Sequence, residues 1–303
     1  MRDKLYRLGV CATLAIILFL GIVLVTLSYT GMGVTCEVGT DGLPLLTCDR
    51  SAIPQPVIED ATELAKTLFG DYQEKADNFV SQVLAIYSEA KDKDFVILFN
   101  SGGWGWTPLE NNPAWETIFN GIKFELNLLG YESLALDYKR TEESWRGRLE
   151  EAAEMANFYP RKAEYLASRV TFLTKHIPHL RVILAGESNG TVIADRVMTI
   201  LEDNPQVYSI QTGPPFWHNS VALERALVLT SNGIIPDSFS QGNPLTMISA
   251  NLKALISFPK AAEDSGAILY YVKAPGHEYW WQYPEVYSEI TNFLKQNFSI
   301  KWR

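Results

Sequence analysis

The sequence predicts an α/β fold built on a mostly parallel, doubly wound sheet. Short apolar runs alternate with longer segments whose apolar residues recur at helical spacing. Several of these runs are apolar throughout, as expected for strands buried on both faces of a parallel sheet. Hydrophobic residues make up 47% of the chain and charged residues 20%, a balance typical of a globular protein that buries a sizeable core.

The strands and helices are expected to alternate through a domain that spans residues 92–303. The expected strands are 95–99, 133–138, 181–185, 207–210, 226–230 and 267–272. The expected helices are 113–129, 141–176 with a break near Pro160, 191–201, 244–258 and 284–298. Right-handed crossovers would place these helices on both faces of the sheet.

The N-terminal segment predicts a membrane anchor. Residues 8–29 carry no charge and are long enough to cross a hydrocarbon core of about 30 Å. Arg2, Lys4 and Arg7 precede them, which places the N-terminus in the cytoplasm and the rest of the chain on the extracytoplasmic side. We therefore expect a single-pass protein with a signal anchor over residues 1–30. A cleaved signal peptide is the alternative, although the run is longer than a usual signal core and no A-x-A site follows it.

A linker and a helical extension are expected between this anchor and the sheet. Residues 31–55 contain Cys36 and Cys48, which could close a small disulfide loop in an oxidising compartment or stay as two free thiols. Residues 56–91 show helical periodicity that is interrupted at Gly70.

Charge excludes one class of partner. The formal net charge is −9, and no Lys/Arg cluster reverses it locally. Because such a surface repels phosphate backbones, we expect no nucleic-acid binding.

The strand at 181–185 runs directly into a motif that predicts a nucleophile. Gly186-Glu187-Ser188-Asn189-Gly190 has the form G-x-S-x-G, and a helix follows it. A sharp strand-to-helix turn of this kind lifts the serine hydroxyl above the edge of the sheet. Ser188 is therefore the predicted nucleophile, with an ordinary glycine-lined turn as the alternative.

A serine hydroxyl needs a base, and the base needs an acid to orient it. His277 follows the last expected strand and so lies at the same carboxyl edge as Ser188, whereas His176 and His179 precede a strand. Asp237 is the only carboxylate in the loop after the strand at 226–230. We predict His277 as the base and Asp237 as the acid.

The tetrahedral intermediate of such a reaction carries an oxyanion that needs fixed donors. The backbone N–H of Asn189, directly after the nucleophile, is one expected donor. The glycine-rich turn after the strand at 95–99 is expected to supply the other, from Gly102, Gly103 or Trp104.

The order Ser188…Asp237…His277, the elbow around Ser188 and the Gly-Gly turn before it together resemble the α/β-hydrolase superfamily, in particular its serine esterases and lipases, over residues 94–298. The resemblance implies an acyl-enzyme on Ser188 formed from esters, thioesters or amides, without a metal or other cofactor. The aromatic loops at the carboxyl edge could form a pocket for a small-molecule or lipid-like acyl substrate, or their side chains could pack in the core and support the loops. Two alternatives stay open: a catalytically silent binding or scaffold protein with this fold, and an acyltransferase that uses the same three residues.

Overall fold

The computed structural model describes residues 50–256, 267–268 and 272–299. The chain divides into two units, 1–38 and 39–303, and every described residue belongs to the second. The predicted anchor at residues 8–29 and the predicted cysteine pair, Cys36 and Cys48, lie outside the described residues. Within the described ranges, no helix combines the length and the apolar character needed to cross a membrane.

Five parallel strands form the main sheet, in the order β2-β1-β3-β4-β5. Their bounds are β1 Phe95–Asn100, β2 Ser133–Asp137, β3 Arg181–Glu187, β4 Val207–Thr212 and β5 Ala226–Leu229. The predicted parallel, doubly wound sheet is confirmed. From β1 the chain adds β2 on one side, and it then returns to add β3, β4 and β5 on the other side. The direction of strand addition therefore reverses between the neighbouring strands β1 and β3. Ligands bind in open α/β sheets outside the carboxyl ends of the strands at such a point.

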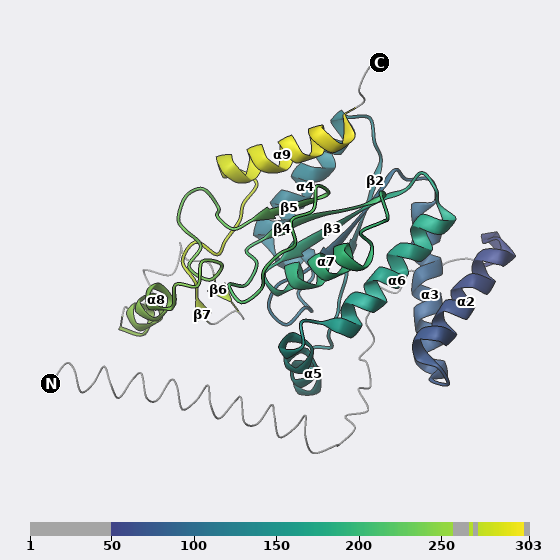
Figure 1. Cartoon of the computed structure of the whole chain (residues 1–303), viewed down its shortest axis with the longest axis horizontal. Helices are drawn as coiled ribbons and strands as arrows, with labels where there is room; N and C mark the ends of the chain where they lie inside the picture. The colour runs from purple at the N-terminus through teal and green to yellow at the C-terminus, as the bar shows by residue number, and fades with distance from the viewer. Residues whose placement is uncertain (1–49, 257–266, 269–271, 300–303) are drawn as a thin grey trace. The chain divides into compact units, whose positions relative to one another are not determined.

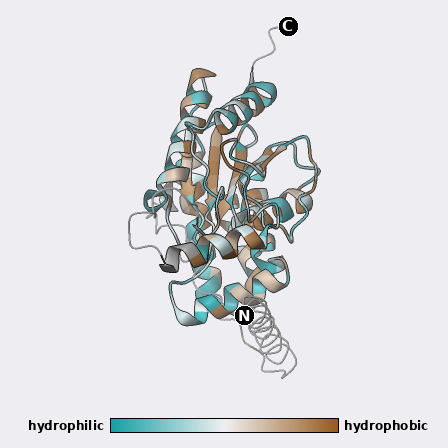
Figure 2. Ribbon diagram, turned by 90° about the vertical axis from the view of Figure 1, so that its left-hand side faces the viewer, coloured by the Kyte–Doolittle hydropathy of each residue, from teal (hydrophilic) through white to brown (hydrophobic). Residues whose placement is uncertain are grey.

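Helices cover both faces of this sheet (Figure 1). The covering helices are α2 Gln55–Phe69, α3 Gln73–Ala90, α4 Pro113–Leu128, α6 Pro160–His176, α7 Asn189–Ile200 and α9 Pro284–Phe298. Alternate side chains of β1 explain the two layers, since Val96 and Leu98 pack with α3, α6 and α7, whereas Ile97 and Phe99 pack with α4 and α9. Figure 2 shows the hydrophobic residues concentrated in the central strands.

The helical extension forms two helices, with the expected break at Gly70. Gly70 has a φ of 58° and follows α2, and α3 begins three residues later. Both helices pack against α6, and buried residues of α3 share a core with Val96 and Leu98 of β1. The predicted helical region 141–176 is likewise two helices, α5 Trp145–Ala156 and α6, separated near Pro160.

The prediction of one strand at 267–272 was wrong. This region contains two short strands, β6 Ala267–Ile268 and β7 Val272–Lys273, which pair with each other in antiparallel fashion. These two strands form a sheet of their own, and neither belongs to the five-stranded parallel sheet. One further helix, α8 Pro244–Ile256, precedes them, and two short 3₁₀ helices span Arg50–Ala52 and Leu109–Asn111.

Candidate active site

Ser188 occupies a strained turn between β3 and α7. Its φ of 49° and ψ of −119° lie where residues with a Cβ are rarely found. A hydrogen bond from Ser188 N to Thr212 O, 2.9 Å long, holds the turn against the end of β4. Gly190 is required for this arrangement, because a Cβ at that position would lie 2.1 Å from the Asn100 carbonyl oxygen. The packing of the sheet thus forces Ser188 into the geometry expected of a nucleophile elbow.

Asp237 and His277 come from different loops and are brought together by the fold. His277 Nδ1 lies 2.8 Å from Asp237 Oδ2, and both side chains are buried. With Asp237 ionised, the shared proton is on Nδ1, which leaves the Nε2 lone pair available to accept a proton.

The loop after β7 is positioned by hydrogen bonds to its backbone carbonyls rather than by a strand of the main sheet. Ser238 N donates to Pro275 O at 2.9 Å, and Asn232 Nδ2 donates to Gly276 O at 3.1 Å. Gly276 has a φ of 82°, and a Cβ there would lie 2.3 Å from Pro236 O, so the two loops approach as closely as they do because this residue is glycine. The His277 loop is therefore fastened directly to the Asp237 loop.

The Asp237 carboxylate is held by five donors. Besides His277, Oδ2 accepts from the Tyr279 hydroxyl at 2.8 Å and from Ser240 Oγ at 2.9 Å. Oδ1 accepts from the backbone N–H groups of Phe239 and Ser240 at 2.9 and 3.0 Å. Burial alone would raise the pKa of Asp237, but the hydrogen bond and charge of His277, followed by the Ser240 and Tyr279 donors, hold that pKa below its usual value.

Tyr279 contributes a permanent donor to this cluster. Burial, together with the adjacent Asp237 carboxylate, raises the pKa of the Tyr279 phenol well above its usual value. The hydroxyl therefore stays protonated and keeps donating to Asp237. Neither Tyr279 nor Ser240 was predicted from the sequence, although Tyr279 lies only two residues after His277.

Ser188 and His277 flank the same stretch of chain, at the end of β4. Ser188 is bonded to Thr212, and the His277 ring lies against the next residue, since a Cβ on Gly213 would be 2.6 Å from His277 Cε1. Neither Ser188 Oγ nor His277 Nε2 has a hydrogen-bond partner among the residues that the structure describes. Both are thus free to engage each other and a substrate, and catalytic hydrogen bonds often tighten only when the substrate binds.

The predicted oxyanion donors differ in availability. Asn189 is the first residue of α7, where the backbone N–H has no partner inside the helix and the helix dipole favours negative charge. In the turn after β1, the Gly102 N–H already donates to Glu187 Oε2 at 3.0 Å, so this predicted donor is engaged. The N–H groups of Gly103 and Trp104 make no hydrogen bond to any described residue, so they stay available.

Two other histidines lie beside carboxylates. His218 Nε2 is 3.0 Å from Asp195 Oδ2, a second histidine–carboxylate pair that sequence reasoning did not predict, and His176 Nε2 is 3.1 Å from Asp60. Across the described ranges, no group of three or more His, Cys, Asp or Glu side chains is arranged to hold a metal ion.

The described part of the chain is thus a parallel α/β fold. At the carboxyl edge of its sheet lie a strained serine between strand and helix and a hydrogen-bonded acid–histidine pair from two later loops. No family model matches the chain, and no curated protein matches its sequence. Among solved structures, it is similar to a chain described as Trichoderma reesei cutinase in complex with a C11Y4 phosphonate inhibitor. The TM-score is 0.42 and the identity 12%, over 82% of this chain and 94% of that one.

Proposed function

We propose that this protein is a serine hydrolase that cleaves ester, thioester or amide bonds through an acyl-enzyme on Ser188. The observation that carries the proposal is the strained Ser188 turn beside a buried, hydrogen-bonded Asp237–His277 pair. A structural serine has no need of a backbone conformation that costs about 1–3 kcal/mol, whereas strain of this kind is concentrated at functional sites.

The chemistry follows from the positions of the donors and acceptors. As Ser188 Oγ attacks the carbonyl carbon of the substrate, His277 Nε2 takes its proton, and Asp237 stabilises the imidazolium that forms. The carbonyl oxygen becomes an oxyanion that the N–H groups of Asn189 and of the turn at Gly103 and Trp104 can bind. The imidazolium then gives its proton to the leaving alcohol, thiol or amine. Water attacks the acyl group in the second half-reaction, with His277 again as the base and then the acid.

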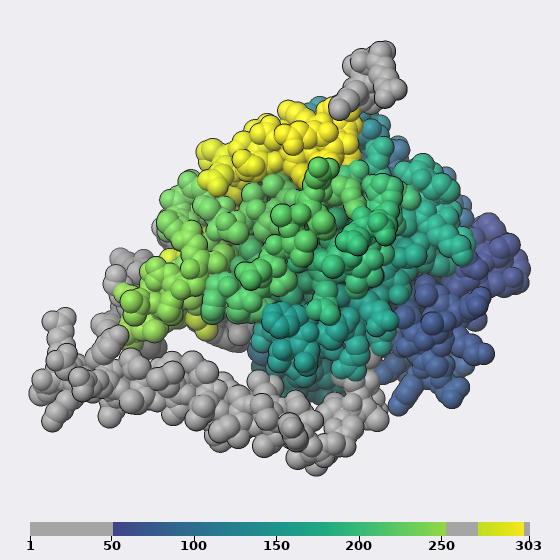
Figure 3. Space-filling model, in the orientation of Figure 1, coloured from purple at the N-terminus to yellow at the C-terminus, as the bar shows by residue number. Residues whose placement is uncertain are grey.

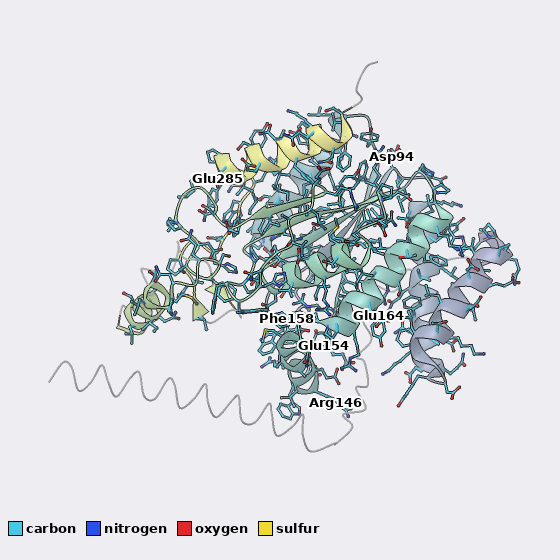
Figure 4. The ribbon with its side chains drawn as sticks, in the orientation of Figure 1. Asp94, Arg146, Glu154, Phe158, Glu164 and Glu285 are labelled. Carbon is cyan, nitrogen blue, oxygen red and sulfur yellow. The ribbon has the colours of Figure 1, made fainter. Side chains whose placement is uncertain are left out.

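The surroundings of the site favour an apolar acyl group. Large apolar side chains are exposed on the segments that follow the carboxyl ends of the strands; these are Trp145, Leu149, Phe158, Phe216, Ile234, Ile235, Leu245, Ile248 and Leu252. Helices α5 and α8, which carry five of them, lie at the surface (Figure 3), and Phe158 is labelled beyond the end of α5 in Figure 4. Each buried methylene contributes about 0.8 kcal/mol, so a longer acyl chain gains affinity on such a surface.

The membrane anchor belongs to the same proposal. Support comes from the uncharged run at residues 8–29 and from the three basic residues before it. Protease protection in sealed membrane vesicles tests it, since an extracytoplasmic domain is digested only when the protease is on that side.

Hydrolysis of p-nitrophenyl esters of increasing chain length tests the enzymatic proposal. The full-length chain, kept in a mild detergent, is compared with Ser188→Ala and with Ser209→Ala, which removes another buried serine hydroxyl in β4. We expect turnover that Ser188→Ala abolishes and Ser209→Ala retains. A folded wild-type protein without turnover would contradict the proposal and favour the scaffold alternative. Product that appears only with an added alcohol or amine would indicate acyl transfer.

A further inference from the structure

A buried arginine holds the turn that faces Ser188. Arg140, in the loop after β2, donates from Nη1 to the Ser101 carbonyl and from Nη2 to the Gly103 carbonyl at 3.1 Å. Its own backbone N–H donates to Gly105 O at 3.0 Å. Three carbonyls of one short turn are thus bound by a single residue nearly forty positions away in the chain.

Gly105 explains how the guanidinium can come so close. It has a φ of 78°, and a Cβ there would lie 2.4 Å from Arg140 Cζ. Glycines at 102, 103 and 105 also leave the backbone of the turn with few conformational restrictions of its own. The turn has one backbone hydrogen bond of its own, from Gly105 N to Gly102 O at 3.1 Å, and contacts from outside the turn complete the definition of its conformation.

The hydrogen bonds from Arg140 fix where the N–H groups of the turn point. In a planar trans peptide the C=O and the following N–H point in opposite directions. With the Ser101 carbonyl on Arg140, the Gly102 N–H points away from it and meets Glu187 Oε2, and a Cβ on Gly102 would lie 3.1 Å from Ser188 Cβ. With the Gly103 carbonyl on Arg140, the N–H of Trp104 likewise points away from the guanidinium.

Arg140 is itself immobilised. It is fully buried, and Nε donates to Glu151 Oε1 at 2.9 Å. Lys162 Nζ donates to Glu151 Oε2 at 2.7 Å and to the Arg140 carbonyl at 2.6 Å, and the Thr141 hydroxyl donates to the same Glu151 oxygen. Burial opposes the charge on Glu151, but Arg140 and Lys162 outweigh it and lower the pKa of that carboxyl.

This cluster carries two positive charges and one negative charge in the interior. Replacing buried ion pairs with apolar residues is often neutral or stabilising, so stability alone gives little reason for such a cluster. Here Nη1 and Nη2 of the guanidinium donate to carbonyls of the turn rather than to Glu151. The planar guanidinium can bind two acceptors side by side in this way, whereas an ammonium group cannot hold the same fixed geometry.

We infer that Arg140 is a positioning residue, which presets the turn at 101–105 so that its N–H groups are oriented before an oxyanion forms. The inference rests on the proposed hydrolase function. It implies that the Arg140 side chain never touches the substrate and acts only through the turn. Preorganised donors of this kind account for much of the rate enhancement of enzymes that stabilise oxyanions.

The test compares Arg140→Lys with Arg169→Lys. Lysine keeps the charge at position 140 but cannot span both carbonyls. Arg169 on α6 is also buried and donates to Gln82 at 3.0 Å, so its replacement by lysine controls for the loss of a buried guanidinium elsewhere. For Arg140→Lys we expect kcat to fall about 10- to 100-fold with KM within about threefold. The loss is smaller than the 10²–10³ in kcat that removal of an oxyanion donor costs, because the donors remain and only their orientation is loosened.

Backbone amide exchange separates this inference from the proposed function. In Arg140→Lys we expect faster exchange over residues 101–106, whether or not the protein turns over esters, and no such change in Arg169→Lys. Unchanged exchange and kcat in a folded Arg140→Lys protein would overturn the inference while the wild-type activity stands. An inactive wild type would instead sink the proposed function.

A second variant covers the case in which Arg140→Lys does not fold. Glu151→Gln keeps an acceptor for Arg140 Nε but removes the charge that anchors the guanidinium. We expect a smaller loss of kcat, about 3- to 10-fold, with faster exchange over the same residues. Wild-type values of both in the folded Glu151→Gln protein would contradict the role assigned to Arg140.

Discussion

Asp237→Asn is the substitution for which the structure gives the most specific expectation. Oδ1 faces two backbone N–H groups, of Phe239 and Ser240, which cannot rotate away. An asparagine must therefore turn its carbonyl oxygen toward them and its amide nitrogen toward His277, Tyr279 and the Ser240 hydroxyl. The two hydroxyls can rotate to become acceptors, but His277 can accept at Nδ1 only by carrying its proton on Nε2.

The wrong tautomer removes the base. With a proton on Nε2, His277 can no longer take the proton of Ser188, and the corresponding change in a serine protease lowers kcat about 10⁴-fold. We expect a loss of this order here, equivalent to about 5.4 kcal/mol of transition-state stabilisation. The free energy of unfolding should fall by only about 1–3 kcal/mol, since most of the donors keep a partner.

The assay measures kcat for a soluble ester together with urea unfolding of the same preparation. Asp195→Asn is the matched control, because Asp195 Oδ2 lies 3.0 Å from His218 and its Oδ1 accepts a backbone N–H from Val221 at 3.0 Å. That variant should keep kcat within a few-fold. A folded Asp237→Asn protein with kcat within tenfold of wild type would refute the reasoning.

Three further outcomes follow from the same contacts. Gly213→Ala should abolish most turnover, because its Cβ would lie 2.6 Å from His277 Cε1. Gly130 also has a positive φ, 87°, but has open space around it, so Gly130→Ala should affect stability alone. Steady-state kinetics of both variants checks this. Tyr279→Phe should lower the free energy of unfolding by about 1–2 kcal/mol, measured with urea, and kcat only several-fold, because four donors to Asp237 remain. The pKa of Asp237 is lower in the folded protein than in the unfolded chain, where it lies near 4. The ionised carboxylate therefore stabilises the folded state above about pH 4, and this stabilisation is lost as the pH falls through the pKa of the folded state. Urea unfolding between pH 5 and pH 2 should show a steeper loss of stability in wild type than in Asp237→Asn.

Local sequence was sufficient to predict the Ser188 turn. Its two glycines, the apolar strand before it and the helix after it all lie within about twenty residues, so no long-range contact was needed to identify it. The parallel sheet was predictable for a similar reason, because each buried strand appears as a short apolar run. The pairing of Asp237 with His277 required an assumption about which loops share an edge, and the structure brings these two side chains together.

The features that were missed are a local antiparallel pairing and contacts between distant segments. The run at 267–272 has strand-like residues, and nothing in its composition shows that its two ends pair with each other. Gly102 was expected to be a free donor, yet its N–H is taken by Glu187, which is 85 positions later. Arg140 likewise reads as an ordinary charged loop residue, and its burial against the turn at 101–105 is visible only in the folded chain.

The central claim is that Ser188 is an activated nucleophile, and a fluorophosphonate tests it most directly. The full-length chain is treated with the reagent, its intact mass is measured, and the modified peptide is mapped. We predict one adduct per chain, on Ser188, that forms far more slowly in Asp237→Asn and His277→Ala and not at all in Ser188→Ala. A folded wild-type protein that takes up no label, or that takes it up equally in Ser188→Ala, would contradict the account.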